Sequence, residues 1–88
     1  KSFDEVIERA NNNDLGLCSY VYTTDLKKAN LASELLESGC VAVNTPAVAV
    51  AEAPFGGIKQ TGYGREGGSM AIKDYLNIKY THFAISYE

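Results

Sequence analysis

The sequence predicts an α/β fold that forms part of a larger sheet. Apolar positions recur at helical spacing in residues 3–10 and 26–36, whereas residues 17–23 and 40–44 are short runs of apolar, aromatic and small residues that favour strands. The order helix, strand, helix, strand with short connections indicates a right-handed parallel unit. Because two strands do not make a stable sheet alone, we expect further strands to complete it.

The first helix is expected to begin at Ser2. Ser2 and Glu5 have the spacing of a capping box, in which hydroxyl and carboxylate each accept a free backbone N–H. Polar residues 11–14 end this helix, and Gly16 completes the turn into the strand at residues 17–23.

The second helix is expected to begin at Thr24 or Asp25, either of which can cap it. Gly39 then ends the segment as a residue with positive φ. Residues 40–44 are continuously apolar up to their last position, which predicts a strand buried on both faces. The buried stripe of the helix is predicted to comprise Leu26, Ala29, Ala32, Leu35 and Leu36.

The second half of the chain is less regular. Residues 45–64 read as a long loop, and loops of that length in compact domains are usually functional or disordered. A short helix is predicted for residues 69–75, followed by a strand at residues 77–87 that has no evident partner in the chain. An unpaired apolar edge of this kind is a place where another chain can dock.

Composition restricts the class of function. The 88 residues suffice for one small domain with a thin core, and the net charge of −3 argues against nucleic-acid binding. No run is apolar for long enough to span a bilayer, so no membrane contact is expected. Cys18 and Cys40 do not make a disulfide framework and are interpreted as small apolar strand residues, which fits a reducing cytoplasm.

The glycine-rich stretch does not have the order of a phosphate-binding loop. Gly57 is not followed by the Gly-Lys-Ser/Thr step of a Walker loop. Gly62, Gly64 and Gly67 match the dinucleotide spacing, but they follow a loop instead of a strand. These glycines are therefore interpreted as permitting tight turns and close backbone approach.

Two further sites could carry chemistry. His82 is the only histidine, which excludes a histidine metal cluster, and its place in the predicted edge strand indicates a surface or interface role. Arg65 and Glu66 lie between glycines and could form a structural ion pair. Alternatively, the same turn could hold Glu66 at the edge of a site, where burial would tune its pKa for proton transfer.

Residues 54–68 carry a specific resemblance. Their sequence, Pro-Phe-Gly-Gly-Ile-Lys-Gln-Thr-Gly-Tyr-Gly-Arg-Glu-Gly-Gly, resembles the signature near the C-terminus of NAD(P)-dependent aldehyde dehydrogenases. Thr61 stands where serine is usual, a change that keeps the hydroxyl. The flanking residues agree in order and spacing, so the resemblance covers essentially the whole chain. Within the family it is closest to the succinate-semialdehyde and ketoglutarate-semialdehyde dehydrogenase branch.

This resemblance implies a C-terminal fragment of the enzyme. Residues 1–76 would be the end of the catalytic α/β domain, with residues 45–64 as the substrate-tunnel loop. Residues 77–88 would be the oligomerisation strand, which in the family pairs with a neighbouring subunit through the positions of residues 78–85. Dimers and tetramers are usual in the family, so self-association through residues 77–85 is expected.

The resemblance also assigns roles to residues. Glu66 occupies the position of a proposed proton relay toward bulk solvent. The backbone carbonyls of Lys59 and Gly62 match positions that bind a monovalent cation in some members. The tunnel positions are Asn44, Thr45, Ala47, Val48 and Phe55, with the phenylalanine as an aromatic wall.

The rest of the machinery is expected upstream of Lys1, including the nucleophilic cysteine, the general base and the cofactor-binding domain. The whole enzyme would use NAD or NADP to oxidise an aldehyde, such as succinate semialdehyde, to a carboxylate. This chain alone is expected to be inactive and to bind neither cofactor. Two alternatives remain: a standalone dimerising module without catalysis, and a nucleotide binder built on the glycine-rich loop.

Overall fold

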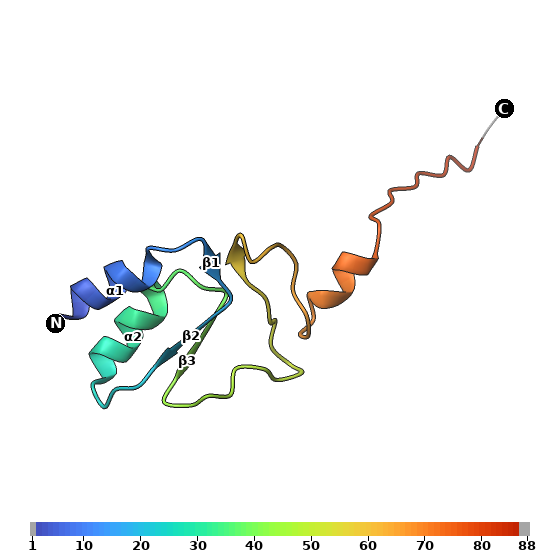
Figure 1. Cartoon of the computed structure of the whole chain (residues 1–88). Coiled ribbons are helices and arrows are strands. Elements are labelled where there is room, and N and C mark those ends of the chain that lie inside the picture. The colour runs from blue at the N-terminus through green and yellow to red at the C-terminus, as the bar shows by residue number, and fades with distance from the viewer. Residues whose placement is uncertain (1, 87–88) are drawn as a thin grey trace.

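The computed structural model describes residues 2–86, of which residues 2–44 form a small α/β unit (Figure 1). Both helices of this unit lie on the same side of a two-stranded sheet. The elements in chain order are α1 (Phe3–Asn11), β1 (Leu15–Gly16), β2 (Cys18–Val21), α2 (Leu26–Leu35), β3 (Cys40–Val43), β4 (Ile58–Lys59) and the 3-10 helix η1 (Ala71–Tyr75).

Side-chain caps fix the start of both α-helices. The Ser2 hydroxyl accepts the Glu5 backbone N–H at 3.2 Å, which confirms the predicted start of α1. The Asp25 carboxylate accepts the Lys28 backbone N–H at 3.1 Å, so Asp25 and not Thr24 caps α2. Each helix therefore begins where a polar side chain replaces a missing backbone acceptor.

The predicted parallel strand pair is confirmed. β2 and β3 run parallel in the register Cys18↔Cys40 to Val21↔Val43, with α2 as the crossover between them. Asn44 closes this pair at its end. Its side-chain oxygen accepts the Thr23 N–H, and its amide donates to the Thr23 carbonyl, both at 2.9 Å.

A second strand pair was not predicted. β1 and β4 pair antiparallel, with Leu15 opposite Lys59 and Gly16 opposite Ile58. Gly16 is therefore a strand residue and not the end of a turn, and residues 45–64 are not a continuous loop. The pair joins the start of the sheet to the glycine-rich stretch, so it places that stretch against the α/β unit.

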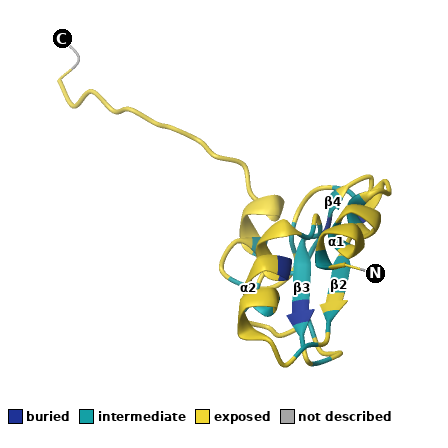
Figure 2. Cartoon of the chain, turned by 90° about the vertical axis from the view of Figure 1, so that its left-hand side faces the viewer, coloured by how far each residue is buried: buried dark blue, intermediate teal, exposed yellow. Residues whose placement is uncertain are grey.

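The apolar core is smaller than the sequence pattern predicts (Figure 2). Among residues 2–86, Ala32 and Ala42 are the only buried apolar side chains, at 2% and 5% exposure. Leu26 and Leu35 of the predicted stripe are 77% and 46% exposed. The expectation that β3 is buried on both faces is wrong for this chain, because only Ala42 of the strand is buried. None of the helices in residues 2–86 has the length and apolar content needed to cross a bilayer.

Gly39 is required for a reason other than the predicted one. Its φ is not positive, because among the described glycines only Gly62, Gly64, Gly67 and Gly68 have positive φ. Instead, a Cβ at position 39 would overlap the Gly56 carbonyl oxygen. Position 39, between α2 and β3, is thus a glycine because two backbone segments touch there.

The C-terminal part extends away from the α/β unit (Figure 1). η1 confirms a short helix within residues 69–75, although it is of the 3-10 type. The strand predicted for residues 77–87 is not formed: residues 77–86 are all exposed and belong to neither helix nor strand, and Tyr87 lies outside the described residues. A strand needs a hydrogen-bonding neighbour, and the described chain offers this segment none. The radius of gyration is accordingly 19.4 Å, against about 12 Å for a compact chain of this length.

Candidate functional site

Phe55 and Glu66 are held opposite each other by their backbones. Each donates its N–H to the carbonyl of the other at 2.7 Å, forming an isolated antiparallel bridge. Both residues line two adjoining cavities, of about 390 Å³ and about 330 Å³. The predicted aromatic wall and the predicted proton relay therefore belong to one site.

Arg65 organises the turns on either side of this bridge. Its guanidinium donates from Nη1 to the carbonyls of Gly57 at 2.9 Å and Gly64 at 2.7 Å. Its backbone N–H donates to the Asp74 carboxylate at 3.1 Å. The guanidinium thus contacts carbonyl oxygens in place of the Glu66 carboxylate, so one of the two sequence interpretations, the Arg65–Glu66 ion pair, is not what holds the turn.

Asp74 was missed by the sequence analysis. It lies in η1, and its carboxylate anchors the backbone immediately before Glu66. An aspartate in a short helix has no motif that marks such a role. The signal could have come only from knowing that η1 folds back onto the glycine-rich turn.

Thr61 ties the glycine-rich stretch to the α/β unit. Its hydroxyl accepts the backbone N–H of Gly16 at 2.9 Å, and Gly16 is buried. Serine and threonine both supply this oxygen, which explains why threonine is compatible with this position. The threonine methyl lies beside Gly57, where no room is left for a Cβ.

Lys59 connects three segments. Its Nζ donates to the carbonyls of Asn11 at 3.0 Å and Asn13 at 3.2 Å, and it lies 2.6 Å from the Glu37 carboxylate. The backbone of Lys59 is left-handed, with a φ of 57°. Among the described non-glycine residues, only Asn44 also has a positive φ, of 58°. Its carbonyl accepts the Gly62 N–H at 3.3 Å.

The backbone carbonyls of Lys59 and Gly62 are the predicted ligands of a monovalent cation, and that role stays a prediction. Within residues 2–86, no three histidine, cysteine, aspartate or glutamate side chains are grouped so that they could hold a metal ion. A site at Lys59 and Gly62 would have to use backbone oxygens, one of which already accepts a hydrogen bond from the other residue.

The predicted tunnel residues before Phe55 lie apart from the two cavities. Asn44 is exposed but its amide is engaged with Thr23, and the Thr45 hydroxyl accepts the Ala47 N–H at 3.1 Å. Neither cavity is lined by any of the four predicted tunnel residues Asn44, Thr45, Ala47 and Val48. The same loop instead contributes Ala49, Val50 and Ala51 to the smaller cavity.

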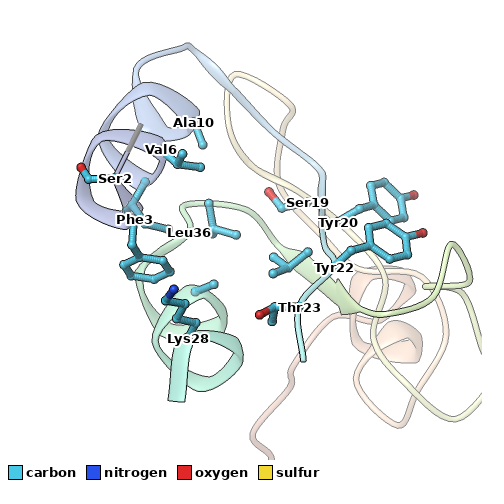
Figure 3. Close-up of a pocket in the computed structure, with 13 residues that line it drawn as sticks. Ser2, Phe3, Val6, Ala10, Ser19, Tyr20, Tyr22, Thr23, Lys28 and Leu36 are labelled. Carbon is cyan, nitrogen blue, oxygen red and sulfur yellow. The ribbon is translucent and has the colours of Figure 1, made fainter. Parts of the chain in front are cut away.

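A larger cavity than these two lies elsewhere. A groove of about 640 Å³ runs between α1, α2 and β2 (Figure 3). Apolar side chains such as Phe3 and Leu36 line it, with Lys28 at its rim. In Figure 3, Ser19 of β2 and Thr23, which follows that strand, point toward the helices, whereas Tyr20 and Tyr22 point to the opposite face of the sheet. Glu66 and Phe55 do not line this groove.

Comparison with protein-family models identifies one match. The model described as "Aldehyde dehydrogenase family" matches residues 1–81. Among curated proteins, the 3-sulfolactaldehyde dehydrogenase of Pseudomonas putida is 54% identical over 90% of this chain and 16% of its own length. The succinate semialdehyde dehydrogenase of Acinetobacter baylyi is 49% identical, with the same coverage of 90% and 16%.

Solved structures agree with this match. The succinate-semialdehyde dehydrogenase of Burkholderia pseudomallei has a TM-score of 0.86 and 42% identity over 91% of this chain. An NAD+ complex of aldehyde dehydrogenase from Bacillus cereus has a TM-score of 0.89 and 42% identity over 98% of this chain. The chain spans 17% and 18% of these two structures, respectively.

Proposed function

The chain belongs to the aldehyde dehydrogenase family, and we propose that it forms the C-terminal end of the catalytic α/β domain in an NAD(P)-dependent enzyme that oxidises an aldehyde to a carboxylate. The family match over residues 1–81 supports this assignment. The structural observation that carries it is the Phe55–Glu66 bridge, because it sets an aromatic side chain and a carboxylate on the same two cavities.

The cofactor of such an enzyme, NAD or NADP, accepts hydride from the substrate. The glycine-rich stretch of this chain is a poor fit for its pyrophosphate. A backbone N–H that could face a phosphate, that of Arg65, already donates to the Asp74 carboxylate, which would repel the anion. We therefore assign this chain no cofactor contact and confine its role to the substrate side, proton transfer and subunit contacts.

In this proposal the substrate tunnel is walled by the loop that follows β3 and by Phe55. Phe55 is half-buried, and a partly covered aromatic ring can exclude water from an aldehyde and orient an apolar chain. The remaining wall positions are Asn44, Thr45, Ala47 and Val48.

The proposed substrate class is an aldehyde with an acidic group at its far end, such as succinate semialdehyde. Two relatives bear names of such aldehydes, 3-sulfolactaldehyde and succinate semialdehyde. Glu52 is the only charged residue in residues 44–53 and is exposed. The cationic groups that would hold the acidic end must therefore come from outside this loop.

Glu66 is proposed to relay protons between the site and solvent. Its exposed position suits that task, because a carboxylate that lines a cavity and reaches water can exchange protons with both. In the enzyme that contains this chain, Glu66→Gln is expected to lower kcat about 100-fold, since glutamine keeps the shape and loses the proton exchange.

The measurement is steady-state NAD(P)H formation from succinate semialdehyde over a range of pH. Glu8→Gln is the matched control, because it removes an exposed carboxylate of α1 that lines neither of the two cavities, and it should leave kcat unchanged. A Glu66→Gln enzyme with unaltered kcat and pH profile would remove Glu66 from the proton path. An enzyme that oxidises no aldehyde with either cofactor would refute the proposed function itself.

Three further assignments rest on this function. Residues 77–85 are proposed to pair with a second copy of the chain, which would cover side chains such as Ile78 and Ile85, now 103% and 93% exposed.

The carbonyls of Lys59 and Gly62 are proposed to bind a monovalent cation. Equal stability of the assembled enzyme in potassium and in choline at one ionic strength would contradict this. The proposed compartment is the cytoplasm, which detection of the intact enzyme in a secreted fraction would contradict.

A further inference from the structure

Cys18 and Cys40 occupy directly paired positions on β2 and β3. In a sheet, paired residues of neighbouring strands project to the same face, and the strands lie about 4.8 Å apart. That spacing falls within the Cα separation of about 4.4–6.8 Å that disulfides adopt. Both thiols are free and half-buried in the described structure.

The pair lies on the face of the sheet that points away from the helices. Tyr20 and Tyr22 point to that face (Figure 3), and Cys18 shares it because alternate residues of a strand project to the same side. The Cys40 Sγ lies 3.8 Å from the Gly56 carbonyl, so the pair is next to the turn that precedes Gly57. Tyr20 is 49% exposed, which leaves an approach from solvent beside Cys18.

The pKa of the Cys18 thiol is affected by burial and by the neighbouring Cys40. Burial raises the pKa of the Cys18 thiol above its ordinary value of 9.0, and the adjacent Cys40 raises it further. A hydrogen bond from Tyr20 acts in the opposite direction and lowers this pKa. A reaction that begins with the Cys18 thiolate will therefore be slow at neutral pH and faster in alkaline solution.

We propose that Cys18 and Cys40 form a modification site, at which a small-molecule disulfide of the glutathione type converts the two thiols into one intramolecular disulfide that joins β2 to β3. This inference stands apart from the proposed aldehyde chemistry, because it uses neither Phe55 nor Glu66. The two cysteines are interpreted from the sequence as small apolar strand residues and not as a disulfide framework, whereas the strand register places them at directly paired positions, from which one disulfide can form.

The reaction proceeds by two exchanges. One protein thiol loses its proton to solvent and attacks a sulfur of oxidised glutathione, which releases one glutathione thiolate and leaves a mixed disulfide. The second protein thiolate then attacks the protein sulfur of that mixed disulfide and expels the second glutathione. Two protein thiols are oxidised, and one glutathione disulfide is reduced to two thiols.

The test is the equilibrium constant for this linkage in glutathione redox buffers. The 88-residue chain is equilibrated at fixed ratios of reduced to oxidised glutathione and increasing urea, quenched in acid, and analysed by mass spectrometry of the intact chain and of its peptides. We expect a species lighter by two hydrogen atoms, with a peptide that joins Cys18 to Cys40. Its formation constant should be at least about tenfold larger in buffer than in high urea.

Matched variants separate pairing from general thiol reactivity. Cys18→Ala and Cys40→Ala should each abolish the internal linkage and leave a single glutathione adduct on the remaining thiol. A formation constant that is the same from buffer through high urea would overturn the proposal, because the fold would then add nothing. Predominant glutathione adducts or covalent dimers of the unsubstituted chain in buffer would overturn it as well.

Discussion

Residues 2–44 and residues 45–86 are held in place by different means. The first region has two capped helices and a parallel strand pair, all formed from neighbouring segments of the chain. In the second region, β4 pairs with β1, Thr61 bonds Gly16, and Lys59 reaches the end of α1. The glycine-rich segment is therefore positioned by the first region rather than by a core of its own.

The candidate site is held in place by its contacts with the first region. The Phe55–Glu66 bridge is a local pairing, but its place relative to the sheet depends on contacts that cross to residues 11, 13–16, 37, 39 and 40. Residues 77–86 have no such contacts and are exposed throughout. Within residues 2–86, regular secondary structure and burial thus decrease along the chain as contacts with the first region become fewer.

The largest effect is expected from removing residues 77–88. Truncation should abolish self-association of the chain, because the tail carries exposed apolar residues such as Ile78 and Phe83, at 103% and 84%. Stability of the α/β unit should change little, since residues 77–86, the described part of the tail, are exposed throughout. Light scattering measures the first effect and urea unfolding the second.

Tyr63→Ser is the control for this truncation. Tyr63 is also fully exposed, at 105%, but lies outside the tail. It should leave self-association intact. Continued association of the truncated chain would place the interface elsewhere.

The next largest effect is expected at Gly39, where the two regions touch. Gly39→Ala should lower the free energy of unfolding by about 3 kcal/mol, because a Cβ at this position overlaps the Gly56 carbonyl, so that the backbone at one of the two positions must move. Gly62→Ala is the control: nothing lies within 4 Å of its Cβ, so only its φ of +114° is strained, at a cost of about 1 kcal/mol. Equal losses in urea unfolding would contradict the close approach at Gly39.

A smaller effect is expected at Thr61. Thr61→Val removes the acceptor for the buried Gly16 N–H and should destabilise the chain by about 2 kcal/mol. Thr61→Ser retains the hydroxyl and should cost less than about 0.5 kcal/mol. Thermal unfolding of the two variants distinguishes the lost hydrogen bond from the lost methyl group, and a larger loss for serine would show that packing dominates.

The elements that were predicted correctly are those with local causes. The caps at Ser2 and Asp25 and the apolar runs of β2 and β3 act within a few residues of the structure they specify. β1 and β4 were not predicted because each has two residues, too few for a periodic pattern. Each also forms its hydrogen bonds with a strand that is distant in the sequence.

Errors arose where a sequence pattern has more than one cause. Gly39 was expected to supply a positive φ, whereas it supplies space for Gly56. The apolar stripe of α2 predicted burial of Leu26 and Leu35, but burial also requires a covering element, and the described residues leave the two side chains 77% and 46% exposed. In the candidate site, Phe55 was predicted through the resemblance and Glu66 also from its place between glycines, while the contact of Asp74 depends on a fold-back that no local pattern encodes.

Amide hydrogen exchange by nuclear magnetic resonance tests most directly the claim that the first region positions the glycine-rich segment. The amides of Phe55 and Glu66, and those of Gly16 and Gln60 that cross between regions, should exchange at least about tenfold more slowly than the amides of residues 78–86. Thr61→Val should accelerate the crossing amides and spare those of α1. Exchange of Phe55, Glu66, Gly16 and Gln60 at the rate of the tail would contradict the account, because the candidate site would then have no fixed place in the fold.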